Sequence, residues 1–272
     1  MNQVKIIFSD MDGTLLNTYG KLSEKTIQSV RQISQRGIPF ILASARAPKE
    51  MIEAVRQLDL KTPLVSYNGG IIYKYNSSGD LQILDSVPLE RKEMQSIYLE
   101  IQERFPDVSL TVYSENTWYA QRYDEGVQAE IQLTGCKPVL ADFNNLILKS
   151  DHTFHKIMIM GDESTLNQLE NELRKHLFSN TAIYRSSLNY LEITHVMANK
   201  LTAVKKIAKY YHFTKEEIMT IGDNYNDLAM IEYAGIGVAV KNAPKEIQHV
   251  ANLITETNDN NGVAYALMNY IN

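Results

Sequence analysis

The chain has 272 residues, of which 44% are hydrophobic and 22% are charged, and its formal net charge is −5. A chain of this length is long enough to form two domains, and its hydrophobic fraction is high enough for a sizeable core. The negative charge argues against nucleic acid or an anionic membrane as the main partner. The chain has a single cysteine and neither a signal sequence nor a long apolar run, and these features indicate a soluble cytoplasmic protein.

The first 75 residues alternate between strand and helix patterns. Apolar runs predict strands at residues 4–9, 38–43 and 64–67. Ser23 can cap a helix that runs to about Arg36, and Pro48 can begin a second helix at its first turn. Strands that alternate with helices predict an α/β fold, in which a parallel sheet is covered by helices on both faces.

The pattern changes after the third strand. Helical stretches near 89–105 and 164–178 are separated by short segments rich in β-branched and aromatic residues, which predicts an inserted α+β domain. From Tyr190–Thr194 onward we expect the earlier pattern to resume. We therefore predict that the core comprises 1–83 and 188–272, that the insert comprises 84–187, and that hinges lie at 84–88 and 186–189.

Two features of the insert have competing interpretations. Trp118 and Tyr119 lie in a strand-like stretch, where aromatic side chains either line a substrate pocket or belong to the core or the sheet surface. His152 and His155 are three residues apart, but no further histidine or cysteine follows with the spacing of a zinc site. A polar loop before a strand is the better interpretation of the histidines.

Acidic residues directly follow two of the predicted strands. Asp10 and Asp12 follow the first strand, and Asp223 and Asp227 follow the apolar run Ile218–Ile221. Because sites in open parallel sheets form beyond the carboxyl ends of the strands, these side chains can meet at one edge. Clustered carboxylates repel one another unless a cation lies between them, and Mg²⁺ prefers carboxylate oxygens together with water and substrate phosphate. We therefore predict a magnesium site built on Asp10 and Asp223, with direct or indirect support from Asp227 or Asn226.

The same residues permit phosphoryl transfer. Asp10, held beside the metal, could attack phosphorus and form an aspartyl phosphate. Asp12 could protonate the leaving oxygen and later deprotonate the attacking water. Ser44 offers a hydroxyl and Lys200 a positive charge to the phosphoryl group, although a cation at the start of a helix is unfavourable unless an anion lies beside it. Arg46 could reach the phosphate or the insert, or form a structural ion pair.

These residues resemble the haloacid dehalogenase-like superfamily of phosphohydrolases, and the resemblance covers nearly the whole chain. Asp10-Met11-Asp12-Gly13-Thr14-Leu15 is similar to the first motif of the family, and Gly222–Asp227 is similar to the fourth. Ser44-Ala45-Arg46 stands where Cof-type members commonly carry Thr-Gly-Arg, and Lys200 stands at the third motif. The insert resembles the type II cap of the Cof-type subfamily.

The resemblance implies a Rossmann-like core, a mobile α/β cap and Mg²⁺-dependent hydrolysis of small phosphorylated metabolites such as sugar phosphates. It implies that Asp10 is the nucleophile and Asp12 the acid/base, and that the backbone carbonyl of Asp12 joins the metal site. A monomer or a homodimer is expected. The implied phosphate contacts are Ser44, Ala45, Arg46, Lys200 and Asn226. Ala45 and Leu201 replace residues that are commonly glycine in the family, which affects substrate fit.

Two other functions remain open at this point. A phosphomutase could use the same core, since a phospho-aspartate can pass its phosphoryl group to a second sugar hydroxyl. A non-catalytic metabolite sensor could keep the fold, but a pure binder has no need for Asp12.

Overall fold

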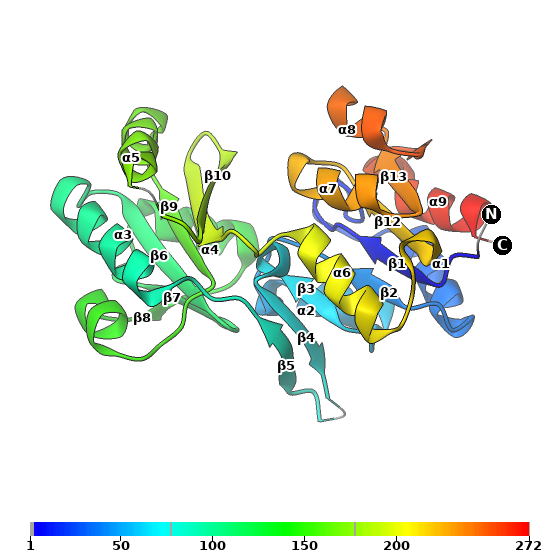
Figure 1. Cartoon of the computed structure of the whole chain (residues 1–272), viewed down its shortest axis with the longest axis horizontal. Helices are drawn as coiled ribbons and strands as arrows, with labels where there is room; N and C mark the ends of the chain where they lie inside the picture. Colours follow the sequence, from blue (N-terminus) through cyan, green and yellow to red (C-terminus); the bar gives the residue numbers. More distant parts are fainter. Residues whose placement is uncertain (1–2, 77, 177, 272) are drawn as a thin grey trace. The chain divides into compact units, whose positions relative to one another are not determined.

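The computed structural model describes residues 3–76, 78–176 and 178–271. The chain divides into two compact units, both shown in Figure 1. The core unit contains the residues up to Arg46, Met51–Asp85 and the chain from Asn199 onward. The inserted unit contains Ser86–Ala198 together with the short segment Ala47–Glu50.

The core unit is built on a five-stranded sheet whose neighbouring strands are all parallel, in the order β14-β13-β12-β1-β2 (Figure 1). Its strands are β1 (Ile6–Ser9), β2 (Phe40–Leu42), β12 (Ile218–Gly222), β13 (Ile236–Val240) and β14 (Leu253–Thr255). Strand β1 pairs with both β2 and β12, so the first strand of the chain lies beside one from its last quarter. The predicted α/β class with a parallel sheet is confirmed.

Helices pack on this sheet as its apolar pattern requires. On one face, Phe8 and Ile41 form a buried cluster with side chains of α6 and α7, among them Ile207 and Met230. Helices α1 and α9 pack against each other, and they contact β2 and β14 respectively. Helix α1 starts as predicted, because the Ser23 side chain accepts a hydrogen bond from the backbone of Thr26. The helices of this unit are α1 (Glu24–Gln35), α2 (Pro48–Leu58) from Met51 onward, α6 (Lys200–Tyr210), α7 (Tyr225–Tyr233), α8 (Lys245–Val250) and α9 (Gly262–Tyr270), with short 3₁₀ turns at Tyr67–Gly69, Lys215–Glu217 and Asn258–Asn260.

A second, three-stranded sheet in the core unit was only partly predicted. It has the order β3-β4-β5, with β3 (Leu64–Ser66), β4 (Ile71–Tyr75) and β5 (Leu81–Ser86). Only β3 was expected from the sequence. The predicted first hinge, 84–88, begins inside β5, and the unit boundary follows Asp85. Strand β5 alternates partly buried with exposed residues, so its hydrophobic signal is weak.

The inserted unit contains a six-stranded, mainly antiparallel sheet in the order β10-β11-β9-β6-β7-β8. Its strands are β6 (Ser109–Ser114), β7 (Thr117–Ala120), β8 (Val139–Leu140), β9 (Lys156–Met160), β10 (Thr181–Ser187) and β11 (Tyr190–His195). Helices α3 (Arg91–Arg104) and α5 (Glu163–Lys175) share a hydrophobic core with one face of the sheet. Helix α4 (Glu125–Thr134) packs on the other face, where Gly126 lies against Ser109. A π-helical segment spans Asn144–Lys149.

The expectation that Tyr190–Thr194 returns to the core was wrong. This segment is β11, which pairs antiparallel with β9 and β10 in the inserted unit. Leu191 and Ile193 are buried and alternate with polar residues, the pattern of a strand with one apolar face, whereas parallel core strands are apolar throughout. The insert therefore ends at Ala198 and not at residue 187, and the predicted hinge at 186–189 is the turn between β10 and β11.

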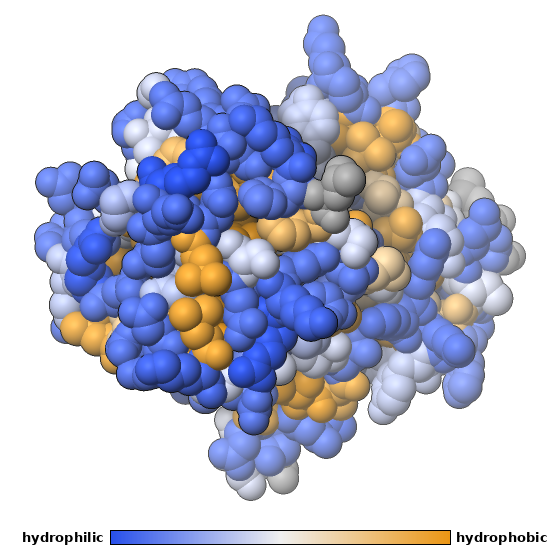
Figure 2. Space-filling model, turned by 60° about the vertical axis from the view of Figure 1, so that its left-hand side comes forward, coloured by the Kyte–Doolittle hydropathy of each residue, from blue (hydrophilic) through white to orange (hydrophobic). Residues whose placement is uncertain are grey.

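The surface of the described residues is mixed in character. Figure 2 shows a mostly hydrophilic face on which hydrophobic residues form small, separated groups. Within the parts of the chain that the structure describes, no helix combines the length and hydropathy needed to cross a membrane.

His155 precedes β9 as expected, but it is fully buried within the inserted unit. Its Nδ1 accepts a hydrogen bond of 3.2 Å from the backbone of Glu115, so the ring proton lies on Nε2, which donates to Ser86 Oγ at 2.9 Å. Burial lowers the pKa of His155 to about 4. The neutral imidazole therefore links Ser86, at the start of the unit, to the loop that contains Glu115 through two hydrogen bonds.

This histidine should make the inserted unit acid-sensitive. Because its folded-state pKa lies below the unfolded value near 6.5, the unfolded chain binds more protons, and stability falls as the pH drops from about 6.5 towards 4, by up to about 3 kcal/mol. Denaturant unfolding at pH 7.5 and 5.0, followed by the fluorescence of Trp118 in the same unit, measures the loss. His155→Gln should shrink the difference between the two pH values. An unchanged difference would contradict the assignment.

Candidate active site

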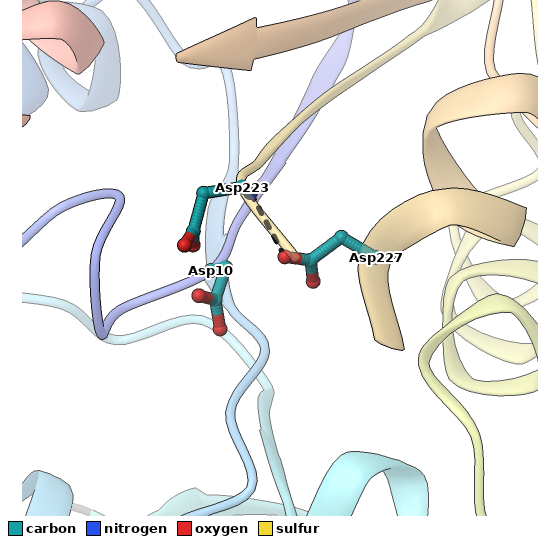
Figure 3. A group of neighbouring side chains, drawn as sticks. All are labelled: Asp10, Asp223 and Asp227. Carbon is teal, nitrogen blue, oxygen red and sulfur yellow. Dashed lines mark hydrogen bonds between the residues drawn. The ribbon is translucent and has the colours of Figure 1, made fainter. Parts of the chain in front are cut away.

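Three carboxylates converge at the carboxyl ends of β1 and β12. Asp10 follows β1 and its backbone amide donates to the carbonyl of Ile221 at 2.9 Å, which fixes the end of β1 against β12. Asp223 follows β12, and Asp227 lies in the first turn of α7. Figure 3 shows the three side chains directed towards one another, and one oxygen from each lies within 4.8 Å of the others. The structure thus brings together the three acids that the sequence placed at one site.

Lys200 lies inside this cluster. Its ammonium group contacts Asp10 Oδ1 and lies 2.5 Å from Asp227 Oδ1. The side chains of Lys200 and Asp227 are fully buried. Lys200 is the first residue of α6, where the helix dipole disfavours a cation, and the two carboxylates supply the anions that this position requires.

Hydrogen bonds hold the other acids in position. Asp227 Oδ2 accepts from the backbone amides of Asp223 and Asn224, at 3.0 and 3.1 Å, as the acidic partner in a capping box at the start of α7. Thr14 Oγ1 donates to Asp223 Oδ1 at 2.7 Å. These hydrogen bonds therefore fix the orientation of both carboxylates.

The cluster carries more negative than positive charge. Burial raises the pKa of Asp10 well above its usual value, and the charges of Asp227 and Asp223 raise it further against the opposing effect of Lys200. Burial also raises the pKa of Asp223. For Lys200, burial alone would lower the pKa, but the charges of Asp10 and Asp227 outweigh it and raise the pKa. The three carboxylates supply hard oxygen donors and exceed the one ammonium group in charge, which fits a divalent cation of the Mg²⁺ type.

Asp12 lies apart from this cluster and binds Arg46. Its carboxylate is about half exposed, and both oxygens accept from the guanidinium, Oδ1 at 2.7 Å and Oδ2 at 2.8 Å. Of the interpretations left open for Arg46, the structure shows an ion pair. Ser44 is buried after β2, and its Oγ accepts from the backbone amide of Arg46 at 3.1 Å, which leaves the hydroxyl hydrogen able to donate elsewhere.

Known proteins share this architecture. The family model described as haloacid dehalogenase-like hydrolase matches residues 7–267. The chain belongs to the haloacid dehalogenase-like hydrolases. A Haemophilus influenzae protein assigned as a phosphatase is 34% identical over 97% of both chains. The 5-amino-6-(5-phospho-D-ribitylamino)uracil phosphatase YcsE of Bacillus subtilis is 28% identical over 98% of this chain and 96% of its own. The crystal structure of a haloacid dehalogenase-like hydrolase from Bacteroides thetaiotaomicron superposes with a TM-score of 0.88, with 29% identity, over 98% of this chain and 99% of that one.

Some contacts in this hydrolase site were not expected from the sequence. Thr14 belongs to the first motif, but its bond to Asp223 links two motifs that only the fold brings together. Asn242 Nδ2 donates to the carbonyl of Gly13 at 2.8 Å, and Asn226 Nδ2 donates to Asn68 Oδ1 at 3.0 Å. The available signals were the turn that contains Asn68, the place of Asn226 in the motif Gly222–Asp227, and the place of Asn242 shortly after β13.

Gly13 is required at its position for two reasons. Its φ is +76°, and a Cβ there would lie 2.5 Å from Asp223 Oδ2. Gly13→Ala should therefore displace the Asp223 carboxylate and lower the activity of the hydrolase by at least about 100-fold, a loss of the size seen when a 1 Å displacement disturbs a catalytic site. Gly20→Ala is the matched control, because Gly20 has a similar φ of +69° with no atom within 4 Å of its Cβ position. Steady-state kinetics compare the two, and equal losses would contradict a steric role at Asp223.

Proposed function

We propose that this haloacid dehalogenase-like hydrolase is a magnesium-dependent phosphatase that hydrolyses small phosphorylated metabolites, sugar phosphates or related phosphomonoesters, through an aspartyl phosphate on Asp10. The observation that carries the proposal is the convergence of Asp10, Asp223 and Asp227 at one point, where Asp10 and Asp227 bind the buried ammonium group of Lys200. The phosphatase names of the relatives support it. One of them, YcsE, acts on a compound with a phosphorylated ribityl chain.

The donor set indicates which residues would hold Mg²⁺. Asp10 and Asp223 would bind the ion together with the backbone carbonyl of Asp12. Asp227 would either bind the ion directly or orient Asp223, whose backbone amide donates a hydrogen bond to Asp227. When bound, the ion would supply positive charge to the phosphoryl oxygens.

The roles of the chain's own groups follow from their positions. An oxygen of Asp10 would attack phosphorus as the bond to the leaving oxygen breaks, and Lys200 would hold that carboxylate in place. Asp12 would give a proton to the leaving oxygen, and it would take one from the water that then releases inorganic phosphate from Asp10. Each Asp12 oxygen accepts one hydrogen bond from Arg46, which leaves a further lone pair on each oxygen for the proton. Ser44, Arg46, Asn226 and the backbone at Ala45 would contact the phosphate.

Metal binding should be visible as a change in stability. Because the excess negative charge of the cluster costs free energy in the folded state, a cation that binds there should stabilise the core unit, by about 2.7 kcal/mol at one hundred times its dissociation constant. Differential scanning calorimetry in chelator and in excess Mg²⁺ measures the shift in Tm. Asp223→Asn should reduce the shift, whereas Asp80→Asn, an exposed residue of the same unit, should preserve it. Equal shifts for both variants would place the ion elsewhere.

Phosphate release from p-nitrophenyl phosphate and a panel of sugar, alditol and nucleotide phosphates, with Mg²⁺ and with chelator, tests the proposed reaction. Metal-dependent release of inorganic phosphate is the expected result. Isomerised sugar phosphate, formed only when a sugar bisphosphate is present, would instead identify a phosphomutase. Tight binding of a phosphorylated ligand in Mg²⁺ without turnover would identify a sensor.

A further inference from the structure

The loop between β1 and α1, residues 10–23, begins with the acidic motif of the site and folds into a tight turn; we call it the β1 loop. The carbonyl of Met11 accepts a hydrogen bond from the backbone amide of Leu16 at 2.8 Å, and both side chains are buried. Thr14 lies within this turn, and its hydroxyl donates to Asp223 Oδ1 at 2.7 Å. The position of the turn therefore affects the direction of the Asp223 carboxylate, which Figure 3 shows facing the other acids.

Two asparagines from the last part of the chain hold the same turn. They follow β13 and β14, whose carboxyl ends lie at the same edge of the parallel sheet as the β1 loop. Asn242 Nδ2 donates to the carbonyl of Gly13 at 2.8 Å, and Asn258 Nδ2 donates to the carbonyl of Leu16 at 3.0 Å. The backbone amide of Asn258 also donates to Asn242 Oδ1 at 2.9 Å. Asn242 therefore uses both ends of its amide group, which fixes the end that faces Gly13.

A third side chain holds the β1 loop further along. Asp259 Oδ1 accepts from the backbone amide of Thr18 at 2.8 Å, and Asp259 Oδ2 accepts from the Thr18 hydroxyl at 2.5 Å. These hydrogen bonds from Thr18 lower the pKa of Asp259, so its carboxylate is ionised at neutral pH and accepts both bonds. Because Asp259 directly follows Asn258, one short segment contacts the loop at two points.

The segment that supplies these contacts is itself fixed. It is the 3₁₀ turn Asn258–Asn260, and Thr257 caps it by accepting from the backbone amide of Asn260 at 3.2 Å. On either side of the turn, the buried hydroxyl of Thr255 in β14 donates to the carbonyl of Gly262 in α9 at 2.7 Å. The turn therefore has its own anchors in the core unit and can act as a support for the β1 loop.

The exposure of these contacts separates two roles. Asn242 and Asp259 are exposed, so water can replace the hydrogen bonds that they make, and the net gain in folding stability is small. Water cannot replace their effect on geometry, because it does not hold the β1 loop at one position. A displacement of about 1 Å in a catalytic site can lower the rate about 100-fold. The contacts therefore matter more for the position of the loop than for stability.

We propose that Asn242, Asn258 and Asp259 are positioning residues of the hydrolase. They fix the β1 loop and, through Thr14, the direction of the Asp223 carboxylate. This role rests on the proposed function, because the position of the loop affects the rate only if its acids carry out the reaction. A positioning role lowers kcat in a protein of nearly unchanged stability, whereas a purely structural role lowers stability and leaves the kcat of the folded enzyme unchanged.

Steady-state kinetics of two alanine variants are the first test. Asn242→Ala and Asn258→Ala should each lower kcat for p-nitrophenyl phosphate about tenfold and leave KM nearly unchanged, an effect typical of groups that orient a site from outside it. Asn269→Ala is the matched control, because Asn269 is exposed in the same unit and donates to a backbone carbonyl, that of Tyr265, at 2.8 Å. It should keep the wild-type kcat. A lower Tm with unchanged kcat in the first two variants would overturn the proposal.

A pair of variants at Asp259 tests whether the hydrogen bonds or the charge matter. Asp259→Ala removes both bonds to Thr18 and should lower kcat about tenfold. Asp259→Asn keeps an acceptor for the Thr18 amide, and its amide group can donate to the Thr18 hydroxyl oxygen, so it should restore the wild-type kcat. Equal losses in both variants would show that the charge acts, and not the position of the loop.

A double-mutant cycle tests the route through Thr14. Thr14→Val removes the hydroxyl that donates to Asp223. If Asn242 acts through this hydroxyl, Asn242→Ala should lower kcat much less in the Thr14→Val protein than in the wild type, so that the two losses are not additive. Fully additive losses would contradict the proposed route.

Isothermal titration calorimetry with Mg²⁺ gives a measurement that requires no turnover. Asn242→Ala should weaken Mg²⁺ binding about tenfold, because the Asp223 carboxylate loses its fixed direction, whereas Asn269→Ala should bind Mg²⁺ as the wild type does. Equal affinities would overturn the positioning role. An Asp10→Asn protein that kept wild-type turnover would instead contradict the proposed function, so the two failures are distinguishable.

Discussion

Asp10→Asn is expected to lower kcat by about 10⁴-fold or more and, at the same time, to raise the thermal stability of the metal-free protein. The loss of activity follows from removing the nucleophile, since an amide oxygen is too weak a nucleophile to form the acyl phosphate. The gain in stability follows from the environment of Asp10, which is buried beside Asp227 and Asp223.

The sign of the stability change comes from proton binding. The folded-state pKa of Asp10 is raised, so the folded chain holds this proton more tightly than the unfolded chain, whose aspartates titrate near 3.9. As the pH rises above that value, ionisation of Asp10 costs folded-state free energy, and the cost is complete once the pH exceeds the folded-state pKa. Asparagine avoids this cost, so the difference in Tm should be large at pH 7 and small at pH 4.

Calorimetry in chelator and steady-state kinetics in Mg²⁺ measure the two effects. Asp59→Asn is the matched control, because Asp59 is exposed and its φ of +54° suits asparagine. It should change neither quantity appreciably. A variant at Asp10 that kept wild-type turnover would rule out the aspartyl phosphate, and one that was less stable than the wild type at pH 7 would contradict the electrostatic description of the cluster.

Lys200→Met is expected to cost about 3–5 kcal/mol of folding stability, since it leaves Asp10 and Asp227 buried without their cation. We also expect kcat to fall by about 100-fold or more, because the ammonium group orients the attacking carboxylate. Excess Mg²⁺ should restore part of the stability by replacing the lost charge, but not the orientation.

Lys209→Met in the same helix is the control for Lys200→Met, because Lys209 is exposed and distant along α6. Urea unfolding of both variants, with and without Mg²⁺, separates the local charge effect from a change in helix propensity. If Lys200→Met lowered the free energy of unfolding by less than about 1 kcal/mol, the carboxylates of Asp10 and Asp227 would have to be protonated or hydrated in the absence of the lysine.

The sequence predicted the parts of the fold and site that depend on short-range patterns. Apolar runs located β1 and β12, and the carboxylates that follow them had to lie at the same sheet edge because both strands are parallel. The bond from Thr14 to Asp223 could not be predicted, since a hydroxyl contact depends on side-chain geometry at sub-ångström precision. The ion pair of Asp12 with Arg46 is similar, because several partners were within reach of a long, flexible side chain.

The error at β11 has another cause. Its alternation of Leu191 and Ile193 with polar residues was visible in the sequence, but a strand of six residues does not reveal which sheet it joins. That choice depends on the cross-strand partners Ile157 and Ile159, which belong to a segment about 30 residues earlier. Strand identity is local, whereas sheet membership is a long-range property.

The position of β1 between β2 and β12 also determines the order in which the chain can fold. During synthesis, β1 and β2 leave the ribosome early, but β12, β13 and β14 follow only after the whole inserted unit. A nascent chain that ends at Ala198 contains all six strands of the inserted sheet but only two of the five strands of the parallel sheet. The inserted unit can therefore fold first. Until β12 has been synthesised, the edge of β1 that pairs with β12 stays exposed and can pair with strands of other chains.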